Sequence, residues 1–142
     1  MVEILVKNSG VVRLKAAGKA ETGMLYAAEA EREIPFAIKR VYFMNGMPPD
    51  AVRGNHAHRT LTQIIFAAGG SFTLALDDGA TKQTIKMSDP SCGIILGPHL
   101  WATMSEFSKD CVILIFADDY YDESEYIRDY AEFLEAIKQD TA

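Results

Sequence analysis

The feature that most limits how this chain can fold is a series of short apolar runs with no helical pattern between them. The runs are rich in β-branched and aromatic residues, and glycine, proline or aspartate separates them. Gly69-Gly70 and Asp78-Gly79 are typical of hairpin turns. The runs cover residues 36–44, 61–79, 81–87, 93–98 and 111–118. Strands this close together predict an all-β fold, an antiparallel sandwich or barrel, rather than a parallel sheet with crossover helices.

The C-terminal tail has a different, helical pattern. Apolar residues recur at three- and four-residue spacing over residues 126–137, and Asp122 is well placed to cap the start of a helix. We expect a single domain of residues 1–142, in which a barrel over about residues 1–119 is followed by a helix over about residues 122–138.

An apolar stripe on this tail bears on assembly. Tyr126, Tyr130 and Phe133 are spaced to share one face of the predicted helix. A lone small barrel would cover such a stripe poorly, so we expect the stripe to pack on the barrel or on a partner subunit. The sequence therefore predicts a homodimer.

The composition favours some partners over others. A net charge of -6 over 142 residues argues against nucleic acid or an anionic membrane surface as the main partner. Neither an export signal nor a membrane-spanning run of apolar residues is indicated. Cys92 and Cys111 lie far apart in apolar surroundings, which is typical of buried reduced thiols. We therefore expect a cytoplasmic protein.

Two of the three histidines stand close together in "RGNHAHRTLTQ", residues 53–63. If this stretch is extended, His56 and His58 face the same side, because side chains alternate along a strand. Ala57 faces the opposite side and is too small to obstruct packing there. Such a pair can clamp a metal ion, carry protons, or have no chemical role.

The surroundings of the pair do not favour a metal. The stretch from Gly54 to Gly70 resembles the first motif of the cupin superfamily, whose metal-binding members have glutamate where this chain has Gln63. After Pro98, where cupins supply a third metal-binding histidine, the chain reads "HLWATM", and His99 is in a different register. Two imidazoles and a neutral amide are a poor ligand set for a catalytic divalent ion. We expect no metal.

Without a metal, the pair is suited to acid–base catalysis. Imidazole titrates near neutral pH, so one ring can accept a proton while its neighbour holds or returns another. The barrel interior of such a fold offers a partly dry cavity for this chemistry. Enolisation next to a carbonyl is the reaction most compatible with two histidines and no cofactor.

Three longer motifs extend the comparison. In order and spacing, "IPFAIKRVYFM", "RGNHAHRTLTQ" and "ADDYYDESEYIR" resemble the sugar 3,4-ketoisomerases that act on dTDP-4-oxo-6-deoxyhexoses. These are small RmlC-type cupins of bacterial deoxysugar pathways, also called the WxcM-like family, and the resemblance runs from Gly23 to Leu134. It implies an antiparallel jelly-roll barrel with a C-terminal helix, a dTDP-linked nucleotide-sugar substrate and no cofactor. The implied reaction moves the oxo group from C4 to C3 through an enediol(ate).

The resemblance also implies roles for individual residues. His58 is the expected base that removes the C3 proton, and His56 is expected to shuttle protons to and from the sugar oxygens. Tyr42 would hydrogen-bond the sugar or steady a histidine, and Arg53 would contact the diphosphate or the sugar. The residues expected around the substrate are Arg53, Arg40, Gln63, Trp101 and His99. We interpret "DYYDESEYIR" as the start of the helix and a packing motif.

The chain departs from the family pattern at three positions. Ala102 follows Trp101 where many relatives have histidine, Thr22 stands where many have arginine, and Phe43 stands where many have a second tyrosine. Each change removes a polar group from or near the expected pocket. Two alternatives therefore stay open, a non-catalytic cupin that binds a nucleotide sugar and a metal-dependent cupin oxygenase.

Overall fold

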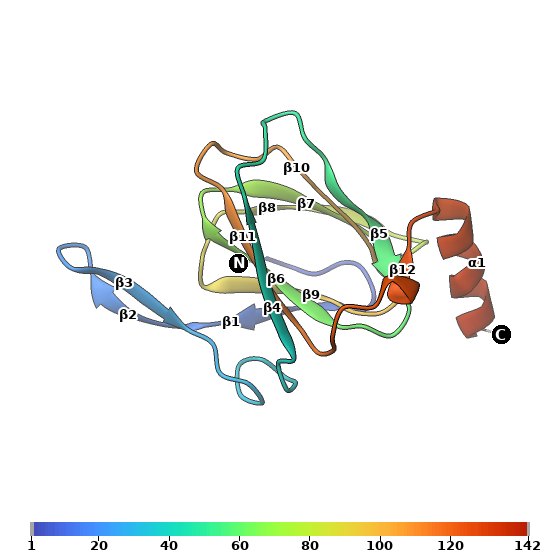
Figure 1. The fold of residues 1–142 in the computed structure, drawn as a ribbon, viewed down its shortest axis with the longest axis horizontal. Helices are drawn as coiled ribbons and strands as arrows, with labels where there is room; N and C mark the ends of the chain where they lie inside the picture. Colours follow the sequence, from blue (N-terminus) through green and yellow to red (C-terminus); the bar gives the residue numbers. More distant parts are fainter. Residues whose placement is uncertain (1, 142) are drawn as a thin grey trace.

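Two antiparallel five-stranded sheets face each other in the computed structural model, which describes residues 2–141. The first sheet has the order β1-β9-β6-β11-β4, with β1 (Ser9–Arg13), β9 (Cys92–Leu96), β6 (Gln63–Gly69), β11 (Val112–Ala117) and β4 (Arg40–Asn45). The second has the order β12-β5-β10-β7-β8, with β12 (Tyr126–Ile127), β5 (Arg53–His58), β10 (Trp101–Ser105), β7 (Phe72–Asp77) and β8 (Lys82–Met87). The predicted jelly-roll arrangement of antiparallel strands is confirmed (Figure 1).

The main core fills the space between the two sheets. Alternate residues of facing strands point inward, because successive side chains of a strand point to opposite faces. Ile65 and Ile113 of the first sheet and Phe72 and Leu74 of the second are all fully buried in one cluster. Burial of such side chains is the main driving force for bringing the sheets together.

The tail differs from the predicted helix over residues 122–138. Helix α1 is shorter at its start and spans Tyr130–Thr141, so the prediction is wrong for residues 122–129. A single turn of 3₁₀ helix, η1, spans Glu123–Glu125, and Asp122 caps this turn rather than α1. The next two residues form β12, which pairs with β5. Hydrogen bonding to a free sheet edge therefore overrides the helical spacing of the apolar residues.

Helix α1 packs on the outer face of the second sheet. Phe133 is fully buried there against Ala57, Trp101 and Ile127. The hydroxyl of Tyr130 donates a hydrogen bond to a carboxylate oxygen of Asp77 at 2.6 Å. The helix lies on the outside of the barrel as predicted, but the barrel of the same chain already covers much of the apolar stripe.

An arm that the sequence pattern did not predict projects from the barrel. Strands β2 (Lys15–Lys19) and β3 (Gly23–Ala27) form a hairpin whose residues are almost all exposed. Figure 1 shows this hairpin, in blue, extending away from both sheets. Thr22, one of the departures from the family pattern, lies in its turn.

Two further expectations concern the thiols and the membrane. Cys92 and Cys111 are both buried and neither forms a disulfide. Within residues 2–141, no helix is long and apolar enough to cross a membrane.

Candidate active site

A cavity of about 390 Å³ opens between the two sheets, a volume within the usual range for small-molecule sites. It lies beside the main core and is lined by both sheets. Its polar lining includes Tyr42, Arg53, His56, His58, Gln63 and Tyr126. The sequence therefore identified five of these six polar residues.

A bulge in β5 places the side chains at the mouth of this cavity. Gly54 and Asn55 have φ angles of 77° and 62°, and the pairing with β10 shifts register at this point. Because Asn55 is an extra residue, Arg53 pairs with Met104 and faces the same side as His56. A Cβ at position 54 would come within 2.9 Å of the Ala102 carbonyl oxygen, so glycine is needed there.

The histidine pair forms a compact cluster of rings with Tyr126. The ring centres of His56 and His58 are 5.0 Å apart, and each packs edge-on against the Tyr126 ring, at 4.9 and 4.6 Å. The cluster forms because β12 pairs with β5 and sets Tyr126 directly opposite His58. The prediction that the two histidines face the same side is confirmed.

Both imidazoles are neutral at physiological pH. Burial lowers the pKa of His58 from 6.5 to about 4, with the neighbouring His56 as the next largest cause. Burial also lowers the pKa of His56. Among the described residues, neither ring nitrogen of His58 has a hydrogen-bond partner. The pair therefore combines two features of a general base, an unprotonated ring and nitrogens free to accept a proton.

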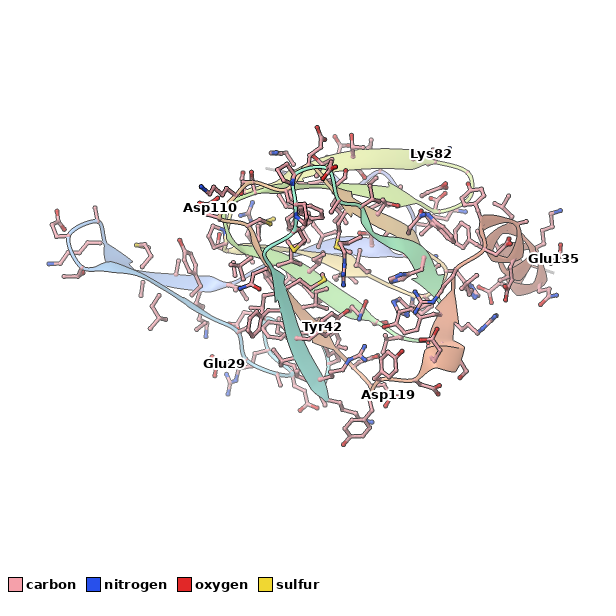
Figure 2. All side chains as sticks on the ribbon, turned by 45° about the horizontal axis from the view of Figure 1, so that its top comes forward. Glu29, Tyr42, Lys82, Asp110, Asp119 and Glu135 are labelled. Carbon is pink, nitrogen blue, oxygen red and sulfur yellow. The ribbon has the colours of Figure 1, made fainter. Side chains whose placement is uncertain are left out.

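Tyr42 lines the cavity from the first sheet, across from the histidines on the second (Figure 2). The side-chain amide nitrogen of the buried Gln63 lies 2.7 Å from its hydroxyl oxygen. The Arg40 guanidinium lies over the Tyr42 ring, 5.0 Å from its centre, and near the Tyr121 ring. Arg40 thus lies behind Tyr42 rather than in the cavity lining.

Two arginines line the cavity. Arg53 has its guanidinium 3.4 Å from the Met44 sulfur, and no described carboxylate lies within ion-pair distance of it. Arg128 makes two hydrogen bonds to the carboxylate of Glu123 and stacks over the Tyr126 ring at 4.5 Å. This end of the cavity is suited to an anionic group.

Tyr126 and Arg128 were missed as site residues by the sequence analysis. Both belong to the "DYYDESEYIR" stretch, which we interpreted as the start of the helix and a packing motif. The signal was the resemblance itself, because the stretch is one of the three motifs shared with the family. The short strand β12 is what turns this motif toward the cavity.

Trp101 and His99 lie outside the cavity lining, contrary to their expected place around the substrate. Trp101 alternates with Ala102 along β10, so Ala102 faces the cavity and Trp101 packs under α1. His99 faces the C-terminal helix, with its Nδ1 atom 3.0 Å from Asp140. Its backbone N–H donates a hydrogen bond to the His58 carbonyl oxygen at 2.9 Å, so its contact with the site is through the main chain.

The residues of the cavity do not form a typical metal site. Among residues 2–141, no group of three histidine, cysteine, aspartate or glutamate side chains is placed to hold a metal ion. Gln63, at the position where metal-binding cupins have glutamate, makes its hydrogen bond to Tyr42 instead.

Comparisons with known proteins agree with this geometry. The family model described as FdtA, WxcM-like, C-terminal matches residues 7–138. A TDP-4-oxo-6-deoxy-α-D-glucose-3,4-oxoisomerase from Aneurinibacillus thermoaerophilus is 44% identical over 115 residues, covering 81% of this chain and 83% of the relative. The 3,4-ketoisomerase QdtA from Thermoanaerobacterium thermosaccharolyticum, solved with TDP, is 33% identical with a TM-score of 0.92, covering 97% and 100%. The WlaRB TDP-quinovose 3,4-ketoisomerase from Campylobacter jejuni is 38% identical with a TM-score of 0.85, covering 92% and 99%.

Proposed function

Because this chain belongs to the FdtA, WxcM-like family, we propose that it is a 3,4-ketoisomerase of TDP-linked 4-oxo-6-deoxyhexoses. A structure of QdtA from the same thermophile, in complex with TDP-4-keto-6-deoxyglucose, is 33% identical with a TM-score of 0.91. We therefore take TDP-4-oxo-6-deoxyglucose as the substrate for testing. The reaction belongs to deoxysugar biosynthesis, and the two unpaired buried thiols fit a reducing cytoplasm.

The proposed reaction needs no net oxidation. His58 takes the proton from C3 of the sugar, and the electron pair of that C–H bond forms a double bond between C3 and C4. The C4 carbonyl oxygen gains the displaced electron pair and a proton, which gives an enediol. Loss of the proton from the C3 hydroxyl and return of a proton to C4 then leave the oxo group on C3.

One observation carries this proposal, the pair of neutral imidazoles side by side in the wall of a cavity. A base must be unprotonated before it can act, and burial keeps His58 in that form at neutral pH. The reaction moves two protons, one on carbon and one on oxygen, so a neighbouring ring is useful. His56 is placed to carry the second proton.

Arg53 and Arg128 are the proposed contacts for the diphosphate. Both line the cavity, and a guanidinium matches phosphate oxygens in charge and shape. Arg53 has no carboxylate partner among the described residues, so it is available to an anion at once. Arg128 would have to leave Glu123 or share it. We therefore expect Arg53 to contribute more to binding.

Two asparagine variants test the proposal. His58→Asn should bind TDP as the wild type does and lose nearly all turnover, since a general base contributes roughly 10²- to 10⁴-fold. His56→Asn should lose less, because water or Tyr42 can relay a proton to oxygen. Full activity in both variants would show that the pair is not the catalytic centre. A wild-type protein that binds TDP-4-oxo-6-deoxyglucose and leaves it unchanged would favour the non-catalytic alternative.

We also propose a homodimer, now on different surfaces from the predicted stripe. A two-stranded hairpin is only marginally stable alone, yet β2–β3 has no cover from its own barrel. Val41 and Phe43 are exposed on β4, an edge strand of the first sheet. Exposed strand edges and apolar side chains of this kind favour pairing with a second copy.

Light scattering tests the assembly. The wild type should scatter as a dimer at micromolar concentration, and Phe43→Asp should shift the population toward monomer. A matched change at a surface away from β4, such as Lys109→Asp, should leave the mass unchanged. A wild-type monomer would contradict the proposal.

A further inference from the structure

We infer that Gln63 is a positioning residue, which holds the Tyr42 hydroxyl so that its proton points into the cavity toward the sugar oxygen that gains negative charge. This inference rests on the proposed function and gives a role to the residue that replaces the glutamate of metal-binding cupins. It makes the side opposite the histidines an active part of the site.

The geometry restricts what the Tyr42 hydroxyl can do. Gln63 is only 2% exposed, and its amide nitrogen lies 2.7 Å from the tyrosine oxygen. Both residues belong to the first sheet, on β6 and β4, with β11 between them. Among the described residues, Gln63 is the only hydrogen-bond partner of that hydroxyl.

The direction of the hydrogen bond follows from the donor. An amide NH₂ group can only donate, so the tyrosine oxygen must be the acceptor. The phenol has a single proton, and this proton is not used in the bond to Gln63. It is therefore free to point toward the cavity that Tyr42 lines.

The hydroxyl keeps that proton over the working pH range. Burial raises the pKa of Tyr42 above its ordinary value of 10.0, with the nearby Tyr126 as the next cause. The Arg40 guanidinium over the ring acts in the opposite direction and polarises the O–H bond. Tyr42 is thus a neutral donor across the cavity from a neutral base.

Enolisation needs both kinds of group. As His58 takes the carbon-bound proton, the carbonyl oxygen becomes negative, and a donor already aimed at it stabilises the transition state. The two sheets supply the two groups, with the base on β5 and the donor on β4. A carboxylate at position 63 would reverse the bond, because it can only accept and would draw the Tyr42 proton away from the substrate.

This reversal gives a test that depends on pH. In Gln63→Glu, a protonated carboxyl can still donate to Tyr42, whereas an ionised one accepts from it. We expect kcat to fall roughly tenfold between pH 6 and pH 9 in this variant, while the wild type changes less than about threefold. In the double variant Tyr42→Phe/Gln63→Glu, this pH dependence should disappear.

Two controls distinguish an effect through Tyr42 from an effect on the histidines or on packing. A new carboxylate that acted through the histidines would raise their pKa and lower activity on the acid side instead. Gln63→Met removes the donor without adding charge, and it should lower kcat with little change in KM or TDP affinity. That loss should be absent in the Tyr42→Phe background. Gln63→Met also serves as the test if Gln63→Glu fails to fold.

Two results would overturn the inference while leaving the ketoisomerase intact. One is a wild-type pH profile in Gln63→Glu, and the other is an equal loss from Gln63→Met with and without the Tyr42 hydroxyl. A wild-type protein that converts no substrate would overturn the proposed function, and this inference with it.

Discussion

The buried histidine at the centre of the site should make the whole fold sensitive to acid. In the unfolded chain a histidine has a pKa of 6.5, whereas burial lowers the pKa of His58 to about 4 in the folded protein. Between these two values the unfolded chain binds the proton and the folded protein does not. The free energy of unfolding therefore falls as the pH is lowered from 6.5 toward 4.

The size of this effect follows from the two pKa values. Proton binding by this one group, integrated from pH 7 to pH 5, lowers the free energy of unfolding by about 2 kcal/mol. His56, whose pKa is also lowered by burial, acts in the same direction. Such a loss is a large share of the stability of a typical small domain.

Urea unfolding at several pH values measures this loss. The wild type and His58→Asn should be compared at pH 8, 7 and 5, with circular dichroism to confirm that both are folded. Between pH 8 and 7 the two should change alike, because an unfolded histidine is mostly neutral there. Between pH 7 and 5 the variant should lose about 2 kcal/mol less. An identical loss in both proteins would refute a buried neutral His58.

Other changes test the base, the metal requirement, the anion contact and the helix packing. Because His58 is neutral down to low pH, kcat/KM should stay flat from pH 7.5 to pH 6, and a midpoint near 6.5 would contradict its lowered pKa. Chelation followed by desalting should leave turnover unchanged, and restoration of a lost activity by one transition metal would favour the oxygenase-like alternative. Arg53→Ala should weaken TDP binding roughly tenfold or more, about 1.4 kcal/mol, and unchanged affinity would move the diphosphate elsewhere. Phe133→Ala should lower the free energy of unfolding by about 3–5 kcal/mol, measured by denaturation, and a loss under 1 kcal/mol would show that α1 is only loosely packed.

Most of the fold could be predicted from the sequence because its strands carry their own signal. The runs that form β6, β7 and β11 combine β-branched residues with hairpin turns, so local pattern and tertiary structure agree. The arm of β2 and β3 gave no such signal, because its lysines, alanines and glycines have low β propensity. The start of α1 was misplaced since Tyr126 and Ile127 pair with a sheet edge that only the fold creates.

The site was predictable where a short motif determines the geometry. His56 and His58 share a face by strand alternation alone. Arg53 was expected near the pair from the resemblance, but only the bulge at Asn55 explains why it turns inward. Tyr126 comes from a strand distant in sequence, and no spacing rule places it beside His58.

The central claim is tested most directly by incubating the wild-type protein with TDP-4-oxo-6-deoxyglucose in D₂O and following the sugar by NMR. A histidine base that exchanges its proton with solvent predicts a 3-oxo product with deuterium at C4, and deuterium at C3 of recovered substrate. His58→Asn should give neither label. Full recovery of unlabelled substrate from the wild type, with TDP still bound by the protein, would contradict ketoisomerase chemistry at this site.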